Sequence, residues 1–149
     1  MGAAMKVLDS GAMIAYLNRE PGCNVVRQLI ESDEELFAHA INLVEVFYDF
    51  LLTSPRAEAE DAIATLKTDG ILERPDMDGT FWRDVAFLIA TRRAQLPNPS
   101  KPREKPRLAL GDACGLALAR RLGAEFVSAD RAELEPVHDA GLARVILIR

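Results

Sequence analysis

Five short apolar segments, separated by stretches of helical periodicity, run through this sequence of 149 residues. They are residues 5–9, 35–40, 71–75, 125–129 and 144–148. Apolar runs of this length suit strands that are buried on both faces. Strands that alternate with helices form a parallel sheet covered by helices on both sides. We therefore predict an α/β fold.

The helical pattern places helices at residues 10–17, 41–52, 57–67, 77–96 and 108–123. Ser10 and Asn42 are predicted as N-cap residues, because their short polar side chains suit that position. Residues 132–140 are irregular or helical. We find no repeat and no composition change, so residues 1–149 are predicted to form one domain.

Composition narrows the setting of the protein. No apolar run approaches the ~20 residues of a membrane-spanning helix, and the N-terminus lacks the pattern of a secretory signal. Cys23 and Cys114 lie far apart and form neither a disulfide framework nor a zinc motif. These features predict a reduced, cytoplasmic protein.

Charge is spread unevenly over the chain. The formal net charge of −5 argues against a protein that coats nucleic acid by bulk electrostatics. Residues 97–107, PNPSKPREKPR, nevertheless combine four basic residues with one acid, and their prolines predict an exposed loop. The arginine pairs 92–93 and 120–121 are expected at solvated helix ends, with contact of some of them to phosphate as the alternative.

Four acids are expected close to the carboxyl ends of the strands, where sites form in such folds. Asp9 ends the first strand, and Asp130 follows the fourth strand. Asp112 opens the helix that leads into the fourth strand. Glu45 lies inside the apolar stretch LVEVF. A buried carboxylate without a partner destabilises the fold by about 3–5 kcal/mol.

Each acid also has an ordinary explanation, as a turn residue or a favourable charge in a first helical turn. Carboxylates that cluster raise one another's pKa unless a cation neutralises them. Mg²⁺ and Mn²⁺ prefer such oxygen ligands, and they can activate water and orient a phosphate. The four acids together therefore indicate a divalent-metal site that hydrolyses phosphodiester bonds.

The segments VLDSGAMIAYLN, INLVEV, LALGDACGLALARRLGAEFVSADR and VILI resemble the PIN-domain family, especially VapC-type toxins of toxin–antitoxin pairs. The resemblance covers nearly the whole chain, in the family's order and spacing. It implies a three-layer α/β/α sandwich with a central parallel sheet of four to five strands. It also implies an Mg²⁺- or Mn²⁺-dependent endoribonuclease, a homodimer and a cognate antitoxin.

Matched residue by residue, the resemblance implies that the metal-binding, catalytic acids are Asp9, Glu45, Asp112 and Asp130. It implies that Ser128, Ser10 and Asn42 orient those acids. Residues 97–107 depart from the family in length, and this loop could bind RNA, contact an antitoxin or be a mobile insertion. Three further acids after Asp130 are expected to be solvated surface groups rather than ligands: Glu133, Glu135 and Asp139.

Two other functions stay open at this point. Aspartyl-phosphate phosphatases also place an Asp at the end of a first strand, but they need a second Asp two residues later, where this chain has Gly11. Phosphatase activity with a phosphorylated Asp9 would support that function. A non-toxin PIN-like nuclease or nucleic-acid-binding module is the other alternative, and metal titration would separate a pure binding module from an enzyme.

Overall fold

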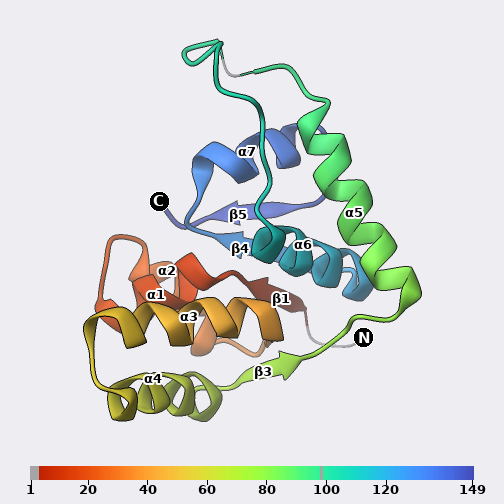
Figure 1. Cartoon of the computed structure of the whole chain (residues 1–149). Coiled ribbons are helices and arrows are strands. Elements are labelled where there is room, and N and C mark those ends of the chain that lie inside the picture. Colours follow the sequence, from red (N-terminus) through yellow and green to blue (C-terminus); the bar gives the residue numbers. More distant parts are fainter. Residues whose placement is uncertain (1–3, 98) are drawn as a thin grey trace.

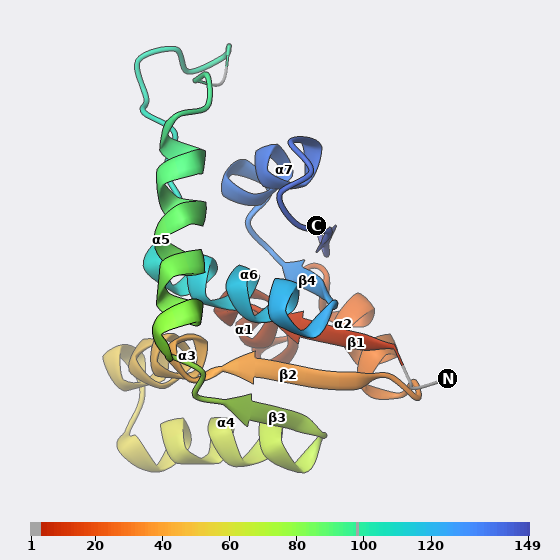
Figure 2. The same ribbon diagram turned by 90° about the vertical axis from the view of Figure 1, so that its right-hand side faces the viewer.

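Five parallel strands form a single sheet in the computed structural model, which describes residues 4–97 and 99–149. The strand order is β3-β2-β1-β4-β5, with β1 at the centre. The strands are β1 (Met5–Leu8), β2 (Glu35–His39), β3 (Ile71–Arg74), β4 (Glu125–Ser128) and β5 (Val145–Leu147). All neighbouring pairs are parallel, so the carboxyl ends of the strands share one edge (Figure 2).

Helices cover both faces of this sheet (Figure 1). One face packs against α1 (Ser10–Asn18), α2 (Cys23–Ile30), α3 (Ala40–Thr53) and α4 (Arg56–Thr68). The other packs against α5 (Gly79–Arg93), α6 (Leu110–Leu122) and α7 (Arg131–Asp139). The predicted three-layer α/β/α sandwich, with a parallel sheet of five strands, is confirmed.

Alternation along each strand builds the two layers of core. In β1, Val7 packs with the α5–α7 layer and Leu8 with the α1–α4 layer. In β4, Phe126 and Val127 divide in the same way, and all four side chains are fully buried. Successive side chains of a strand point to opposite faces of the sheet, so these central positions of β1 and β4 are apolar on both faces.

The N-caps of two helices differ from the prediction. Asp9, not Ser10, caps α1: its Oδ1 accepts a hydrogen bond from the Ala12 N–H at 2.7 Å. His39, not Asn42, caps α3, with Nδ1 accepting from the Ile41 N–H at 3.1 Å. Both capping residues come directly after or at the end of a strand, in extended backbone that suits a cap. Ser10 and Asn42 consequently lie inside the first helical turns.

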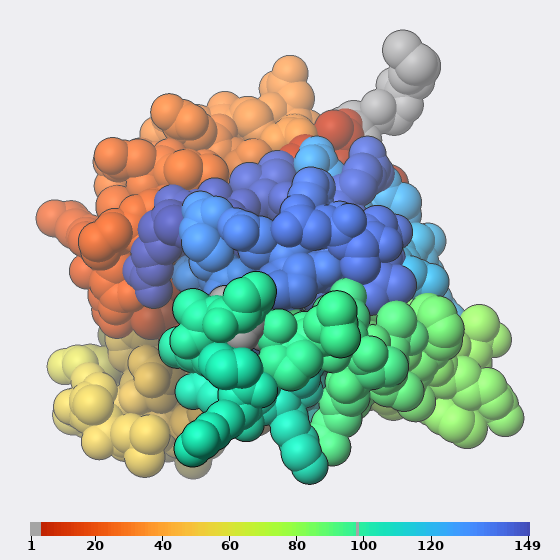
Figure 3. All heavy atoms as spheres, turned by 90° about the horizontal axis from the view of Figure 1, so that it is seen from above, coloured from red at the N-terminus to blue at the C-terminus, as the bar shows by residue number. Residues whose placement is uncertain are grey.

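The described residues between Arg93 and Leu110 form neither helix nor strand, and most of them are exposed. This loop projects beyond α5 and α6 and lies beside α7 (Figures 1 and 3). Within the described ranges, no helix is long and apolar enough to cross a membrane. Cys23 and Cys114 are both free thiols.

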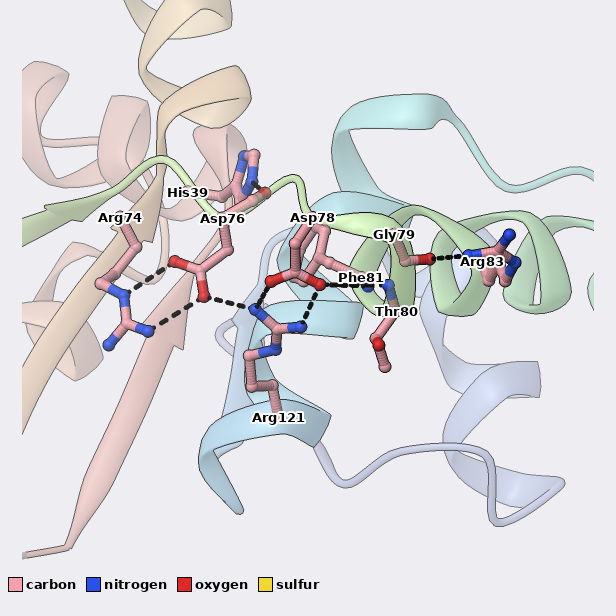
Figure 4. A network of polar contacts seen from close by, with 9 residues as sticks. All are labelled: His39, Arg74, Asp76, Asp78, Gly79, Thr80, Phe81, Arg83 and Arg121. Carbon is pink, nitrogen blue, oxygen red and sulfur yellow. Dashed lines mark hydrogen bonds and ion pairs between the residues drawn. The ribbon is translucent and has the colours of Figure 1, made fainter.

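The start of α5 is tied to the end of α6 by an arginine (Figure 4). Arg121 contacts Asp76 at 3.0 Å and Asp78 at 2.7 Å, and Asp78 also caps α5. Arg74 makes a second ion pair with Asp76 at 2.8 Å. Arg121 is an exposed residue in the last turn of α6, as expected, and it also forms ion pairs with two acids of the β3–α5 connection.

Candidate metal centre

Acids from four segments meet at the carboxyl edge of the sheet. Asp9 follows β1, Asp130 follows β4, Asp112 lies in the first turn of α6, and Glu45 lies in α3. All four predicted acids line one cavity of about 600 Å³. Glu133, in the first turn of α7, lines the same cavity. The topology thus brings together five carboxylates that lie up to 124 residues apart in the chain (133 minus 9).

Asp9 is the most deeply buried of the five, with 2% of its surface exposed. Burial raises the pKa of Asp9 to about 6, against the lowering effect of hydrogen bonds from Ser128 and the Ala12 N–H. The charges of Asp130 and Glu45 add to the rise. The carboxylate is therefore fixed in place, and it is costly to ionise without a compensating cation.

Glu45 is held from the neighbouring turn of its own helix. Asn42 donates from Nδ2 to Glu45 Oε1 at 3.1 Å and to the Gly111 carbonyl oxygen at 3.1 Å. Asn42 therefore connects α3 to the start of α6. Gly111 leaves space for the carboxylate, because a Cβ built at this position would lie 2.1 Å from Glu45 Oε1.

The tightest group consists of Asp112, Asp130 and Glu133. One carboxylate oxygen from each lies within 4.8 Å of the others, close enough to bind a single metal ion. Burial strongly raises the pKa of Asp112, and a hydrogen bond with Glu133 and the charges of Asp9, Glu133 and Asp130 raise it further. Without a cation, Asp112 therefore keeps a proton well above the range of an ordinary aspartate.

The sequence prediction of Glu133 as a solvated surface acid is wrong. Its side chain is only 13% exposed. The carboxylate forms an ion pair with Arg107 at 3.0 Å and accepts a hydrogen bond from the Ala109 N–H at 3.3 Å. Its own N–H donates to Asp130 Oδ1 at 3.1 Å. The spacing Asp-x-x-Glu at a helix start could have indicated it, because an N-cap and the third helical residue lie on the same side.

Of the three side chains predicted to orient the acids, two make such contacts. Ser128 is fully buried, accepts a hydrogen bond from the Asp130 N–H at 2.9 Å, and hydrogen-bonds with Asp9. Asn42 holds Glu45. Ser10 lines the cavity, and its side chain makes no hydrogen bond to the acids in the described part of the chain.

Three arginines lie at the rim of the cavity: Arg107 from the loop before α6, Arg131 at the start of α7, and Arg149. Arg131 pairs with Glu135, and Arg149 pairs with Glu20 at 3.3 Å. The site is thus acidic inside and basic outside. An arrangement of this kind can hold a divalent cation while its rim binds a phosphate.

Comparison with known proteins agrees with this geometry. The PIN domain model matches residues 6–135. No curated protein matches the chain in sequence.

Several solved structures share this fold, and in each of the three that follow the aligned chain is 98% covered. A chain of VapBC-1 from nontypeable Haemophilus influenzae aligns with 97% of this chain at 16% identity and a TM-score of 0.66. A chain of VapBC2 from Rickettsia felis, bound to a promoter DNA fragment, aligns with 96% at 12% identity and a TM-score of 0.63. A chain of FitAcB from Neisseria gonorrhoeae aligns with 97% at 18% identity and a TM-score of 0.56.

The family match spans most of the chain, and the fold agrees with these structures over nearly its whole length. The chain belongs to the PIN-domain family.

Proposed function

We propose that this protein is a metal-dependent endoribonuclease and acts as the toxin of a toxin–antitoxin pair. The observation that carries the proposal is the group of five carboxylates in one cavity, three of them with oxygens within 4.8 Å of one another. Carboxylates repel one another, so this arrangement is unfavourable unless a cation compensates the charges. Membership of the PIN family supports the nuclease activity.

The residues present fit Mg²⁺ or Mn²⁺. Every candidate ligand is a carboxylate oxygen, the donor that these hard cations prefer, and neither histidine lines the cavity. The pKa values of Asp9 and Asp112 are raised, so a bound cation would stabilise the ionised form of both carboxyl groups. Asp112, Asp130 and Glu133 would hold the ion, with Asp9 and Glu45 completing the acidic wall.

When bound, such a cation stabilises negative charge on a phosphate and lowers the pKa of the attacking water. The chain's own groups set the geometry of the reaction. Ser128 and the Ala12 N–H fix Asp9, and Asn42 fixes Glu45, so these carboxylates need no reorganisation when substrate arrives. Water adds across the phosphodiester bond, which leaves a 5′-phosphate and a 3′-hydroxyl.

Glu133 connects the acidic cavity to its basic rim, because its carboxylate contacts Arg107 and the Ala109 N–H. If Glu133 held a cation, the Arg107 guanidinium would be free to bind a phosphate oxygen of the substrate. Arginine suits that role because its planar donors match phosphate geometry.

The proposed partners are an antitoxin and a second copy of the chain, in the cytoplasm. Toxin–antitoxin assemblies among the solved structures of this fold support the antitoxin. A row of apolar side chains along α3 supports protein partners in general, since each is at least 44% exposed: Val44, Tyr48, Leu51 and Leu52. Exposed apolar patches of this kind mark interaction sites.

The test of the nuclease activity is cleavage of single-stranded RNA by the purified protein in Mn²⁺. We expect cleavage by the wild-type chain, none in EDTA, and a loss of at least about a hundred-fold in Asp112→Asn and Asp9→Asn. Asp139→Asn, which changes an exposed acid outside the cavity, is the matched control. Equal cleavage by all four folded proteins would refute the proposal.

A further inference from the structure

A second cavity lies beside the acidic one, under the loop that precedes α6. This loop groove has a volume of about 290 Å³ and is lined on its basic side by Arg92, Lys101, Lys105 and Arg107. The groove and the acidic cavity share Arg107, Asp130 and Glu133 as walls. A chain that leaves the acidic cavity on this side therefore enters the groove directly. Figure 3 shows the loop lying over α5 and against α7.

Arg92 is the unusual residue of the groove. It lies in the last turn of α5 and is only 7% exposed, whereas the sequence placed it at a solvated helix end. Its Nη1 donates to Gln95 Oε1 at 2.9 Å, but its buried Nε has no hydrogen-bond partner in the described part of the chain. A buried donor without an acceptor is destabilising, and more so when it is charged. The position thus lacks an acceptor.

The basic side chains that the loop contributes to the groove also have few acidic partners. Among the residues that the structure describes, Arg107 is the only one of the four basic lining residues that forms an ion pair, with Glu133. Within residues 4–97 and 99–149, no acid lies within ion-pair distance of Lys101 or Lys105. Glu104 is the one acid that the loop itself contributes to the groove. Four prolines limit the conformations that the loop can adopt: Pro97, Pro99, Pro102 and Pro106.

We propose that the loop groove binds backbone phosphates of single-stranded RNA next to the bond that is cleaved, with Arg92 as its buried anchor. The inference rests on the proposed function, because the same RNA strand must pass through the acidic cavity. An acidic site repels the flanking phosphates of its substrate, and the groove supplies the opposite charge at its exit. Phosphate oxygens also supply the acceptor that Arg92 Nε lacks.

A protein partner fits the groove less well than a nucleic-acid backbone does. Apart from the loop proline Pro106 and Ala132, every lining residue is charged, so the groove offers little apolar surface to a peptide. The row of exposed apolar side chains on α3 offers a protein partner more apolar surface than the lining of the groove does. Contacts to phosphates alone also predict a groove that does not discriminate between bases.

The first experiment measures binding of a labelled single-stranded RNA by fluorescence anisotropy, in EDTA, at several salt concentrations. EDTA removes any contribution of metal, so the readout does not depend on cleavage. Lys101→Gln/Lys105→Gln is compared with Arg56→Gln/Lys67→Gln, which removes two exposed charges from α4 at the far side of the molecule (Figure 1).

For the loop variant we expect affinity to fall about ten-fold. The slope of log Kd against log salt should decrease by about 1.4, since each phosphate contact to a single strand contributes about 0.7. The α4 variant should match the wild-type protein. Absence of wild-type binding, or an equal loss in both variants, would overturn the proposal; unchanged RNA affinity in the loop variant would also do so and would favour a protein partner.

The second experiment replaces Arg92 by Met, which keeps the volume and removes the charge. If Arg92 serves RNA, Arg92→Met should bind RNA about five- to ten-fold more weakly and melt at the same or a higher temperature, because buried charges often reduce stability. A lower melting temperature with unchanged RNA affinity would show a purely structural arginine. Arg92→Lys, which retains the charge, should recover part of the affinity.

These measurements separate the two proposals. RNA that binds through the groove but is never cut in Mn²⁺ would refute the nuclease activity and keep the groove. Metal-dependent cleavage with the same KM in the wild-type protein and in Lys101→Gln/Lys105→Gln would keep the nuclease and refute the groove.

Discussion

Gly111 lies on α6 where the Glu45 carboxylate passes it. A Cβ at this position would lie 2.1 Å from Glu45 Oε1, so a larger residue must displace either the carboxylate or the helix. The glycine is therefore required by the site rather than by the helix, which would favour alanine by about 1 kcal/mol.

We expect Gly111→Ala to lower RNA cleavage by about a hundred-fold through displacement of Glu45, since a shift of about 1 Å in a site can have that effect. The melting temperature should change little, because alanine's helix propensity offsets the displacement. Gly79→Ala is the control: its Cβ would meet the flexible end of Arg83 and, at 4.0 Å, Trp82 Nε1. Full activity in Gly111→Ala would contradict this role of the glycine.

The raised pKa values of Asp9 and Asp112 predict a loss of stability as pH rises. Both acids hold protons in the folded protein at pH values where the unfolded chain has released them. Stability is thus present in full below the ordinary aspartate pKa near 4 and is lost as pH rises through the folded pKa. For Asp9, whose folded pKa is about 6, the loss amounts to about 3 kcal/mol.

Thermal unfolding in EDTA between pH 5 and pH 8 tests this prediction. The melting temperature should fall over that range in the wild-type protein and fall less in Asp112→Asn, whose amide cannot ionise. Mn²⁺ should restore the wild-type melting temperature at pH 8, because a cation favours the ionised carboxylates. A melting temperature that stays constant or rises with pH in EDTA would contradict the buried, protonated state.

The N-terminus of α5 depends on its attachment to α6. Arg121 bridges Asp76 and Asp78, and hydrogen bonds from Arg74 and Arg121 lower the pKa of Asp76 to about 2 against the effect of burial (Figure 4). His39 Nε2 lies 2.8 Å from the Asp76 carbonyl oxygen, and its ring stacks on Phe81. The end of β2, the β3–α5 connection and two helices therefore meet at one cluster, on the side of the sheet opposite α1–α4.

Replacing Arg121 by Gln should lower the free energy of unfolding at pH 7, because Asp76 and Asp78 lose the guanidinium with which both form ion pairs. A lowered carboxyl pKa stabilises the fold above the ordinary value near 4 and ceases to do so as pH falls to about 2. The difference between wild type and Arg121→Gln should accordingly shrink between pH 5 and pH 2 in urea titrations. Arg56→Gln, at an exposed ion pair, serves as the control and should change little.

Over the whole molecule, apolar patterning was sufficient to predict the architecture. Every predicted strand is present, and its ends lie within one or two residues of the prediction. A sheet buried on both faces needs consecutive apolar residues, such as VL in β1 and FV in β4. The helix starts were less predictable. Asp9 and His39 act as caps at the ends of strands, and sequence alone did not distinguish them from the polar residues that follow.

The four acids matched to the family lie in one cavity, as their positions at strand ends predicted. Glu133 and Arg92 were missed for a different reason. Both belong to helices whose surface pattern predicts solvated charges, and their burial arises from the loop that packs over α5 and α7. Contacts made by a long irregular loop leave no periodic signal in the sequence.

Calorimetric titration of Mn²⁺ tests the acidic cavity as a metal centre most directly. Wild-type protein should bind Mn²⁺ at pH 8 and release protons, since Asp112 must ionise to become a ligand. Asp112→Asn and Glu133→Gln should bind at least about ten-fold more weakly, and Asp139→Asn should match the wild-type protein. No Mn²⁺ binding by the wild-type chain, or equal binding by all four proteins, would contradict the metal centre.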